Sequence, residues 1–420
     1  MSGTVGRQES SGDDWAALCV EHLDQHLLEN HIYPFLVRVI HDGDQLRKAV
    51  DNNEANDADG QLHYPIGEWD VSRVQDFSYV FSVTRNVDSI ADVERYLEDG
   101  DSFLAENYVN EFNEDISTWD VRNGTDFRFM FYRCTRFSHD LSGWNMEKAV
   151  CLRSMFHGCE HFEGRGLAHW NMGSVVDFTD LFFGCTYFRA DLFPWNVSSG
   201  QSFDGMFRGC ELMDGDLTQW DVSNGKTFDR MFSGCEVFNG NLSNWNVGNS
   251  RTFQSMFHNC ERFDSDLSGW NMSNSTNLQG MFRSCVTFTG DGLVHWDVGR
   301  VTNFEHMFAD ATNFSGDLYH WNVGNGQTFN RMFEWCTLFR GDLSCWNVSN
   351  GTDFTYMFRN CINFDSDLSW WDMAEAVSCQ GMFSRSSIFD GDLSDWNVRK
   401  VKEMHEMFCD CKRFRGGYLK

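Results

Sequence analysis

The sequence predicts an α/β solenoid, because three features repeat together along most of the chain. Tryptophans recur at intervals of 25 or 26 residues after one first gap of 50, and a phenylalanine always follows twelve positions later. Within each copy, apolar residues change from a two-residue spacing to a helical spacing. A period in this range is typical of stacked repeats, each of which buries its apolar side only against its neighbours. The thirteen tryptophans are residues 69, 119, 144, 170, 195, 220, 245, 270, 296, 321, 346, 371 and 396.

One clean copy, residues 220–244, shows how each repeat is built. Counted from the Trp as position 0, Trp220 and Val222 have the spacing of a short strand with one buried face. Positions +8, +11, +12 and +15 then follow the i, i+3, i+4, i+7 stripe of a short helix. Each copy is therefore expected to form a strand, a turn, a short helix and a turn. The residues of the stripe are Phe228, Met231, Phe232 and Cys235.

The chain divides into a leader, a cap and the repeats. Residues 1–13 are expected to be a disordered leader, and residues 14–60 contain two amphipathic stretches that predict a helical N-terminal cap. The repeat solenoid is expected over 61–420. Residues 86–110 interrupt it with apolar residues at helical spacing, which predicts an inserted helix, although a decayed repeat is the alternative.

Composition limits the classes of partner. The formal net charge of −29 disfavours nucleic acid and anionic membranes, both of which need a basic surface. No apolar run of about 20 residues predicts a membrane span, and the N-terminus lacks the pattern of a secretory signal. We therefore expect a soluble intracellular protein or a component of an assembly, with an extracellular or cell-surface location as the alternative.

The repeat motif resembles that of a known family. The pattern L-x-x-W-x-V followed by F-x-x-M-F-x-x-C-x-x-F, as in residues 217–238, is similar to the BspA-like leucine-rich repeats of bacterial surface proteins, in their Trp-containing branch. The resemblance covers more than four fifths of the chain. It implies a curved, leucine-rich-repeat-like α/β solenoid of about 12–13 strand–turn–short-helix repeats that binds other molecules, often as an adhesin. It implies no catalytic residues.

Position +15 is usually Cys, where the family commonly has a small apolar residue. We expect these thiols to be small, reduced core residues, because thiols that face one way on parallel rungs suit neither a disulfide nor a tetrahedral metal site. Disulfides between rungs, or a metal held by the column, remain the alternatives. The residues expected to form structural ladders are Trp220, Trp245, Trp270, Phe232, Phe257, Phe282, Cys235, Cys260, Asn246 and Asn271.

Two polar columns also repeat. Position +1 is always Asp or Asn, and its amides are expected to hydrogen-bond from rung to rung. A second column of Asp precedes the Leu at position −3, as at Asp216 and Asp266, and is expected to accept hydrogen bonds from turn amides. No cofactor is expected. Calcium bound along these columns is the alternative, since hard cations prefer several oxygen ligands.

The position just before the Trp gives the candidate binding site. It becomes aromatic or His towards the C-terminus, which is typical of a binding hot spot. In a curved solenoid this face is generally the concave one, so a protein partner is expected there. The candidate residues are His295, Tyr319, His320 and Trp370, with Cys345 between the last two.

These features predict a non-enzymatic scaffold that presents an extended acidic and polar surface to a protein partner. The alternatives are a cell-surface adhesin, and a structural component joined to an assembly through its open C-terminal edge, with end-to-end self-association possible. An enzyme is not expected, because identical repeats supply no unique set of nucleophile, base and oxyanion donors.

Overall fold

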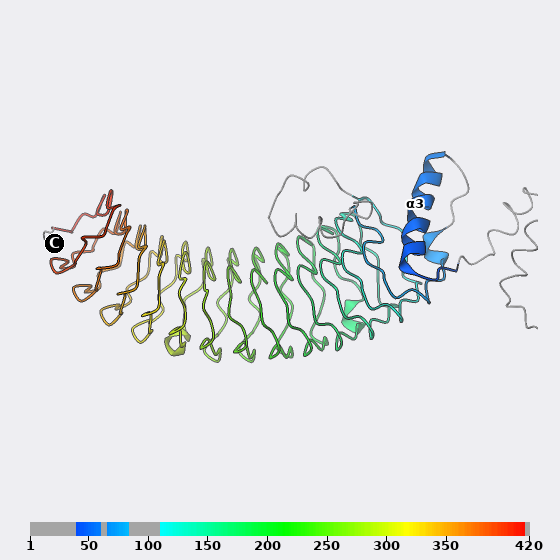
Figure 1. The fold of residues 1–420 in the computed structure, drawn as a ribbon, viewed down its shortest axis with the longest axis horizontal. Helices are drawn as coiled ribbons and strands as arrows, with labels where there is room; N and C mark the ends of the chain where they lie inside the picture. Colours follow the sequence, from blue (N-terminus) through cyan, green and yellow to red (C-terminus); the bar gives the residue numbers. More distant parts are fainter. Residues whose placement is uncertain (1–38, 60–64, 84–109, 416–420) are drawn as a thin grey trace, which may run out of the picture.

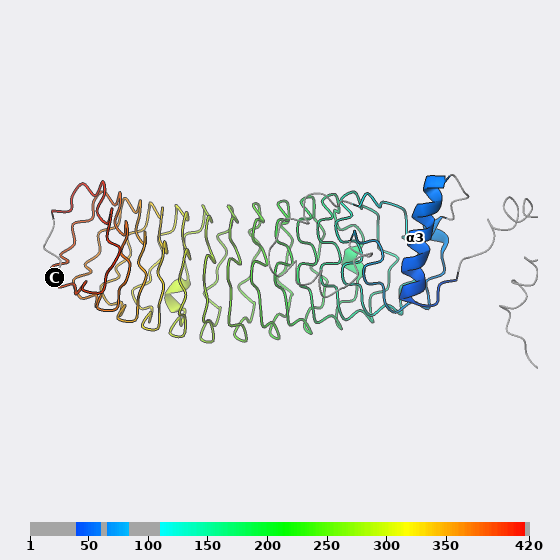
Figure 2. The same cartoon turned by 45° about the horizontal axis from the view of Figure 1, so that its top comes forward.

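The computed structural model describes residues 39–59, 65–83 and 110–415. These residues form a long, curved stack of rungs, with one helix against the first rung (Figures 1 and 2). That helix, α3, spans Gly43–Asp59 and lies inside the predicted cap. The predicted leader (1–13), the first part of the cap and all of the 86–110 segment except Asn110 lie outside the described residues. We refer to each rung by its Trp.

The predicted strand at the Trp is absent, and the rungs pair at another position. Isolated parallel bridges connect position +7 of one rung to +7 of the next, for example Asp177 to Ser202 and Ser202 to Thr227. The remainder of each described rung consists of turns and connecting backbone. Short 3-10 helices occur at η3 (Ile66–Glu68), η5 (Leu167–His169) and η6 (Leu293–His295).

The predicted short helix is also wrong, because alternate amides in positions +8 to +15 donate to different partners. In the rung of Trp195, the amides of Phe203, Gly205, Phe207 and Gly209 donate to carbonyls of the next rung over 2.7–3.1 Å. The amides between them, such as that of Met206 to Phe203 O at 3.2 Å, close local turns. A helix would satisfy all of these groups internally, whereas here half of them join the rungs.

From the rung of Trp119 onwards, positions +10 and +14 of every rung have a left-handed backbone. A positive φ at the third residue of a turn is the requirement of a type II turn, and glycine meets it without strain. Gly205 and Gly209 have φ of 58° and 72°. In other rungs a larger residue takes the same conformation, including Trp335 at 63° and Tyr356 at 55°.

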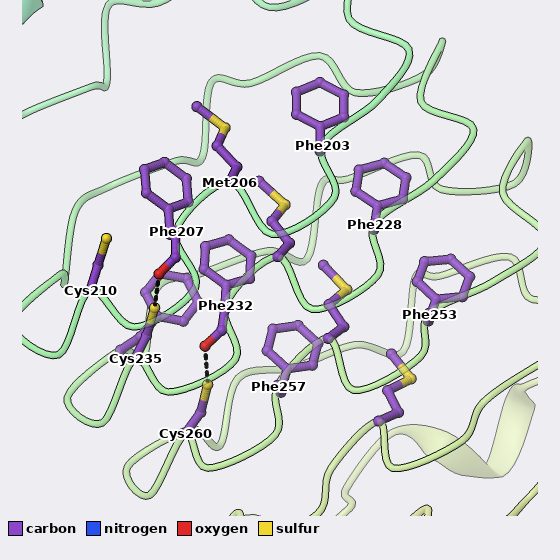
Figure 3. Packing of buried hydrophobic residues seen from close by; sticks show 14 of the residues in the cluster. Phe203, Met206, Phe207, Cys210, Phe228, Phe232, Cys235, Phe253, Phe257 and Cys260 are labelled. Atoms are coloured by element: carbon purple, nitrogen blue, oxygen red, sulfur yellow. Dashed lines mark hydrogen bonds between the residues drawn. The ribbon is translucent and has the colours of Figure 1, made fainter. Parts of the chain in front are cut away.

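The core consists of continuous columns of identical residues. The rings of Trp220 and Trp245 lie parallel with centroids 6.3 Å apart, and Trp245 and Trp270 are 6.5 Å apart. Phe257 stacks 5.7 Å from Phe232 and 5.6 Å from Phe282. These side chains, with the Cys of position +15, are fully or almost fully buried. Figure 3 shows the Phe, Met and Cys columns side by side.

The thiols at position +15 and the ladder indoles from Trp119 onwards also donate hydrogen bonds to the preceding rung. Cys235 Sγ donates to Phe207 O at 3.0 Å, and Cys260 Sγ to Phe232 O at 2.9 Å (Figure 3). Trp245 Nε1 donates to Leu217 O at 3.2 Å. In the rung of Trp371, Ser386 replaces the Cys and its hydroxyl donates to Phe358 O at 2.5 Å. The Cys column is therefore a row of buried donors as well as a row of apolar groups.

The curvature follows from unequal spacing between equivalent residues. Because equivalent rings are almost parallel, their centroid separation measures the local displacement from rung to rung. It is 6.3 Å at Trp220–Trp245, 5.3 Å at Phe203–Phe228 and 4.9 Å at Tyr79–Phe129. The face that carries positions +7 to +14 is therefore concave and the Trp edge is convex. Figure 1 agrees, since η6, just before Trp296, lies on the convex edge.

Candidate interaction surface

The predicted binding residues lie on the convex edge, which corrects their expected concave placement. Trp370 is 84% exposed, and His295 and His320 are exposed as well. Tyr319 contacts His320 edge to face at 5.0 Å. Its hydrogen bond with Cys345 of the next rung raises the pKa of the Tyr319 hydroxyl. The structure thus brings Tyr319, His320 and Cys345 together, and Trp370 stands one rung further along.

A more structured surface lies on the concave face, around the rungs of Trp321 and Trp346. Glu334 is 6% exposed and forms ion pairs with Arg331 at 3.3 Å and Arg359 at 3.2 Å. Both guanidinium groups also lie over the ring of Tyr356, with distances of 4.9 and 5.0 Å to its centroid. The paired charges and the ring hold one another in a fixed arrangement. We call these four residues and Trp335 the concave cluster.

Trp335 makes this cluster unusual. It is 42% exposed although its backbone is left-handed, a conformation that an L-residue adopts at a cost of about 1–2 kcal/mol. Four earlier rungs place Gly at this position, as in Gly209 and Gly234. A partly exposed Trp therefore takes the place of Gly, and the exposed part of its indole is free to contact a partner.

Exposed apolar side chains and one buried, unpaired polar group occur in the same rung as Trp335 or in the next one. Leu338 and Ile362, on the same and the next rung, are 48% and 44% exposed. Asn360 is 5% exposed, and its Nδ2 has no hydrogen-bond partner among the described residues. Buried polar groups normally have such a partner, so this unpaired amide is an exception within the fold. The surface combines Trp, Tyr and Arg, the residues enriched at binding hot spots.

The other half of the concave face carries carboxylates and a ring stack. Burial, the largest cause, raises the pKa of Asp180 and Asp204 to about 6. Nearby, His157 stacks on Phe183 at 4.2 Å, and Arg208 lies over the same ring at 4.9 Å. Burial, followed by Arg133 and Arg208, lowers the pKa of His157 to about 3, so this imidazole is neutral at pH 7.

The two polar columns stabilise turns within their own rungs. At position +1, Asn246 Oδ1 accepts from Gly248 N at 3.2 Å and Asn271 Oδ1 from Ser273 N at 3.1 Å, rather than from the neighbouring rung as predicted. In the second column, Asp266 accepts from Ser268 N at 2.8 Å, as expected. This backbone bond, followed by the Ser268 hydroxyl, lowers the pKa of Asp266.

No metal site or membrane span is found in the described part of the chain. Over residues 39–59, 65–83 and 110–415, no three His, Cys, Asp or Glu side chains form a group suited to a metal ion. None of the helices there is long and apolar enough to cross a membrane. The described cysteines are free thiols, and burial raises the pKa of Cys235 and its equivalents well above the ordinary value.

The sequence prediction missed the concave cluster. These residues are at positions +10, +13 and +14, outside the predicted apolar stripe of +8, +11, +12 and +15, so the stripe did not single them out. The overlooked signal was glycine, which recurs at +14 in Gly158, Gly184, Gly209 and Gly234 although it destabilises a helix interior by about 1 kcal/mol. A Trp at a position that the other rungs from Trp119 onwards fill with Gly, Ser or a charged or amide residue would have singled out Trp335.

Comparison with known proteins covers the same repeats. Residues 48–166, 150–270, 251–355 and 327–419 match the family described as "Mycoplasma protein of unknown function, DUF285". The chain belongs to the DUF285 family. The four matches together run from within α3 to the last rung. No curated protein matches the chain.

Among solved structures, the DUF285 chain is similar to one titled "Crystal structure of TLR13-ssRNA13 complex". The two are 10% identical, with a TM-score of 0.18. The alignment covers 64% of this chain and 48% of the other, so it spans about half of that protein's length.

Proposed function

We propose that this DUF285 protein is a non-enzymatic scaffold, a leucine-rich-repeat-like solenoid that binds a protein partner through its concave face. Trp335 is the observation that carries the proposal. A partly exposed Trp in the same rungs as the fixed Arg331–Glu334–Arg359 network gives this face the composition of a binding hot spot. The charged groups beside it are held in place before binding, which lowers the entropic cost of association.

Capture of partners with paired variants tests this function. The wild-type chain and the variants Trp335→Ser and Trp370→Ser are purified under reducing conditions with whatever binds to them in stoichiometric amount. We expect Trp335→Ser to lose the partner, and Trp370→Ser, on the convex edge, to retain it. The melting temperatures of all three should agree to within a few degrees, because neither side chain is in the core.

Two results would overturn the proposal. One is a partner retained by Trp335→Ser, and the other is a partner lost only with Trp370→Ser. The second result would transfer the function to the convex residues His320 and Trp370, which have the same exposed aromatic character.

The BspA-like branch and its adhesin function are the second candidate. The two candidates differ in compartment, and the buried thiols favour a reducing one, since the described cysteines are free. Exposed Cys345 and Cys409 provide the readout. In protein isolated with thiols blocked at lysis, both are expected as free thiols. Disulfides or glycans on the peptides that contain them would favour the adhesin.

A further inference from the structure

A groove runs along one flank of the stack, between the convex Trp edge and the concave face. It crosses four consecutive rungs, those of Trp270, Trp296, Trp321 and Trp346, and its volume is about 650 Å³. The residues that line it occupy positions +4 and +6 of these rungs. We call this surface the flank groove.

The flank groove is a neutral stretch of an acidic surface. Its lining consists of Thr, Asn and Gln side chains and one charged residue, Arg300, and no Asp or Glu is among the residues that line it. On the next rung to either side, the same two positions carry charged residues, Arg251 and Glu375. The net charge of the whole chain is −29. The groove therefore suits an uncharged ligand that extends over four rungs.

Hydrogen bonds to the backbone hold the side chains of the groove in place. The amide groups of Asn325 and Asn350 donate to carbonyls of the preceding rung at 2.6 and 2.7 Å. The hydroxyls of Thr276, Thr302 and Thr352 donate to the preceding rung in the same way, over 3.0–3.3 Å. Because these side chains are already fixed, a ligand that contacts them loses little affinity to their ordering.

The groove keeps hydrogen-bonding capacity for a ligand. Each Asn and Thr uses its donor on the backbone, so its side-chain oxygen remains an acceptor. Exposed Gln327 makes no side-chain hydrogen bond with a described residue. Arg300 Nη1 donates to Asn274 Oδ1 at 3.0 Å, and the guanidinium forms no ion pair with a described residue. A ligand that carries many hydroxyls can both donate to the oxygens and accept from Gln327 and Arg300.

The rungs repeat at the spacing of an extended sugar chain. Phe304, Phe329 and Phe354 each lie two positions after a groove residue, and their rings are 5.4 and 5.3 Å apart. A chain of pyranoses joined through equatorial oxygens advances by one ring and one oxygen per sugar, a length close to this spacing. An extended peptide rises about 3.3 Å per residue, so its residues do not stay in step with the rungs. A nucleic acid is repelled by the negative charge of the chain.

We propose that the flank groove binds an unbranched, uncharged polysaccharide whose sugars are joined through equatorial oxygens. The chain lies along the stack with one sugar on each rung, so that about four sugars contact the protein. Its hydroxyls donate to the oxygens of Asn325, Asn350 and Thr302, and accept from Gln327 and Arg300. This site is separate from the concave cluster and does not depend on the protein partner proposed there.

Titration of the full chain with soluble sugars tests the proposal. The probes are cellohexaose and N-acetylchitohexaose, which have equatorial linkages, and the control is maltohexaose, in which axial linkages coil the chain. We expect at least one probe to bind at least about tenfold more tightly than maltohexaose. Its affinity should not change with salt, because the ligand is uncharged. Equal binding of maltohexaose, no binding of either probe, or binding that salt abolishes would overturn the proposal.

Paired variants locate the site. Thr302→Val with Gln327→Ala removes one hydroxyl and one amide from the groove and should weaken binding at least about fivefold. Thr125→Val with Gln201→Ala makes the same changes at position +6 of two rungs outside the groove and should bind as wild type. Thr125 and Thr302 both donate to the preceding rung at 3.3 Å, so the two double variants should have similar melting temperatures. Trp335→Ser should bind the sugar normally. An equal loss of binding in both double variants would contradict this placement.

Discussion

The two halves of the concave face have the same backbone but different side chains at position +14. In the rungs of Trp144 to Trp220 this position is Gly, with φ between 70° and 78°, and in the rungs of Trp245 to Trp371 it is a larger residue with φ between 60° and 63°. The hydrogen bonds between rungs are equivalent in both halves. The difference teaches that the core and the rung-to-rung bonds determine this backbone, so the side chain at +14 is free to serve another purpose.

The largest effect is expected from a β-branched side chain in the half of the concave face where position +14 is Gly. We call this part, the rungs of Trp144 to Trp220, the glycine half. Gly209→Val should destabilise the protein by about 2–3 kcal/mol, because a β-branched residue is strained at a φ of 72°. Denaturant unfolding measures the change. The reverse substitution, Trp335→Gly, should alter stability by less than about 1 kcal/mol. If Gly209→Val unfolds at the same denaturant concentration as wild type, the left-handed backbone does not restrict the side chain at +14. The contrast between the two halves would then have no energetic basis.

A second test concerns the buried carboxylates of the glycine half. The pKa of Asp180 and Asp204 is about 6 in the folded state and 3.8 ordinarily. At pH 7 both carboxyl groups are ionised although they are buried, and this lowers the stability of the folded state. As pH falls from about 6 towards 3.8, the folded state protonates first and gains stability. Asp180→Asn with Asp204→Asn should therefore stabilise the protein at pH 7, by roughly 1–2 kcal/mol, and less at pH 5.

Melting temperatures of wild type and double variant at the two pH values measure this effect. Burial gives His157 and His258 pKa values below the ordinary 6.5, so these residues destabilise the fold as pH falls. Both proteins contain them, and their contribution cancels in the difference. An advantage of the double variant that is as large at pH 5 as at pH 7 would show that neither carboxyl has a raised pKa.

A third test uses the Cys ladder, which is common to both halves. Cys235→Ala removes the donor to Phe207 O and should cost about 1 kcal/mol, whereas Cys235→Ser keeps a donor, as Ser386 does, and should cost less. Cys361→Ala in the other half should match Cys235→Ala, because Cys361 donates to Phe333 O in the same way. If the two Ala variants lose different amounts of stability, the core differs between the two halves, as the surface does.

The smallest effect is expected from chelation. Asp216 and Asp266 already accept hydrogen bonds from turn amides, so the column can be satisfied without calcium. We expect the melting curve to be unchanged when a calcium chelator is added. A lower melting temperature, restored by added calcium, would establish the calcium alternative.

The sequence predicted which residues are buried better than it predicted their conformation. Phe228, Met231, Phe232 and Cys235 lie in the core because a helical stripe and this series of turns place the same positions inward. The hydrogen-bond partners could not be predicted locally, since Gly205 N donates to Asp229 O, 24 residues later. The curvature depends on differences of about 1 Å in rung-to-rung distance between one column of side chains and another. These differences cannot be predicted from the repeat motif. The convex placement of His320 and Trp370 was therefore missed.

The 3-10 helices η5 and η6 have a consequence for how such chains change length. They occur in the two intervals of 26 residues, before Trp170 and Trp296, and each follows a left-handed glycine, Gly166 or Gly292. The extra residue is absorbed on the outer edge, while the inner bridges continue in register from Cys151 to Asp177 and from Asn277 to Asn303. The convex edge of this protein can thus take up an extra residue in a repeat, and the opposite surface keeps its rung-to-rung spacing.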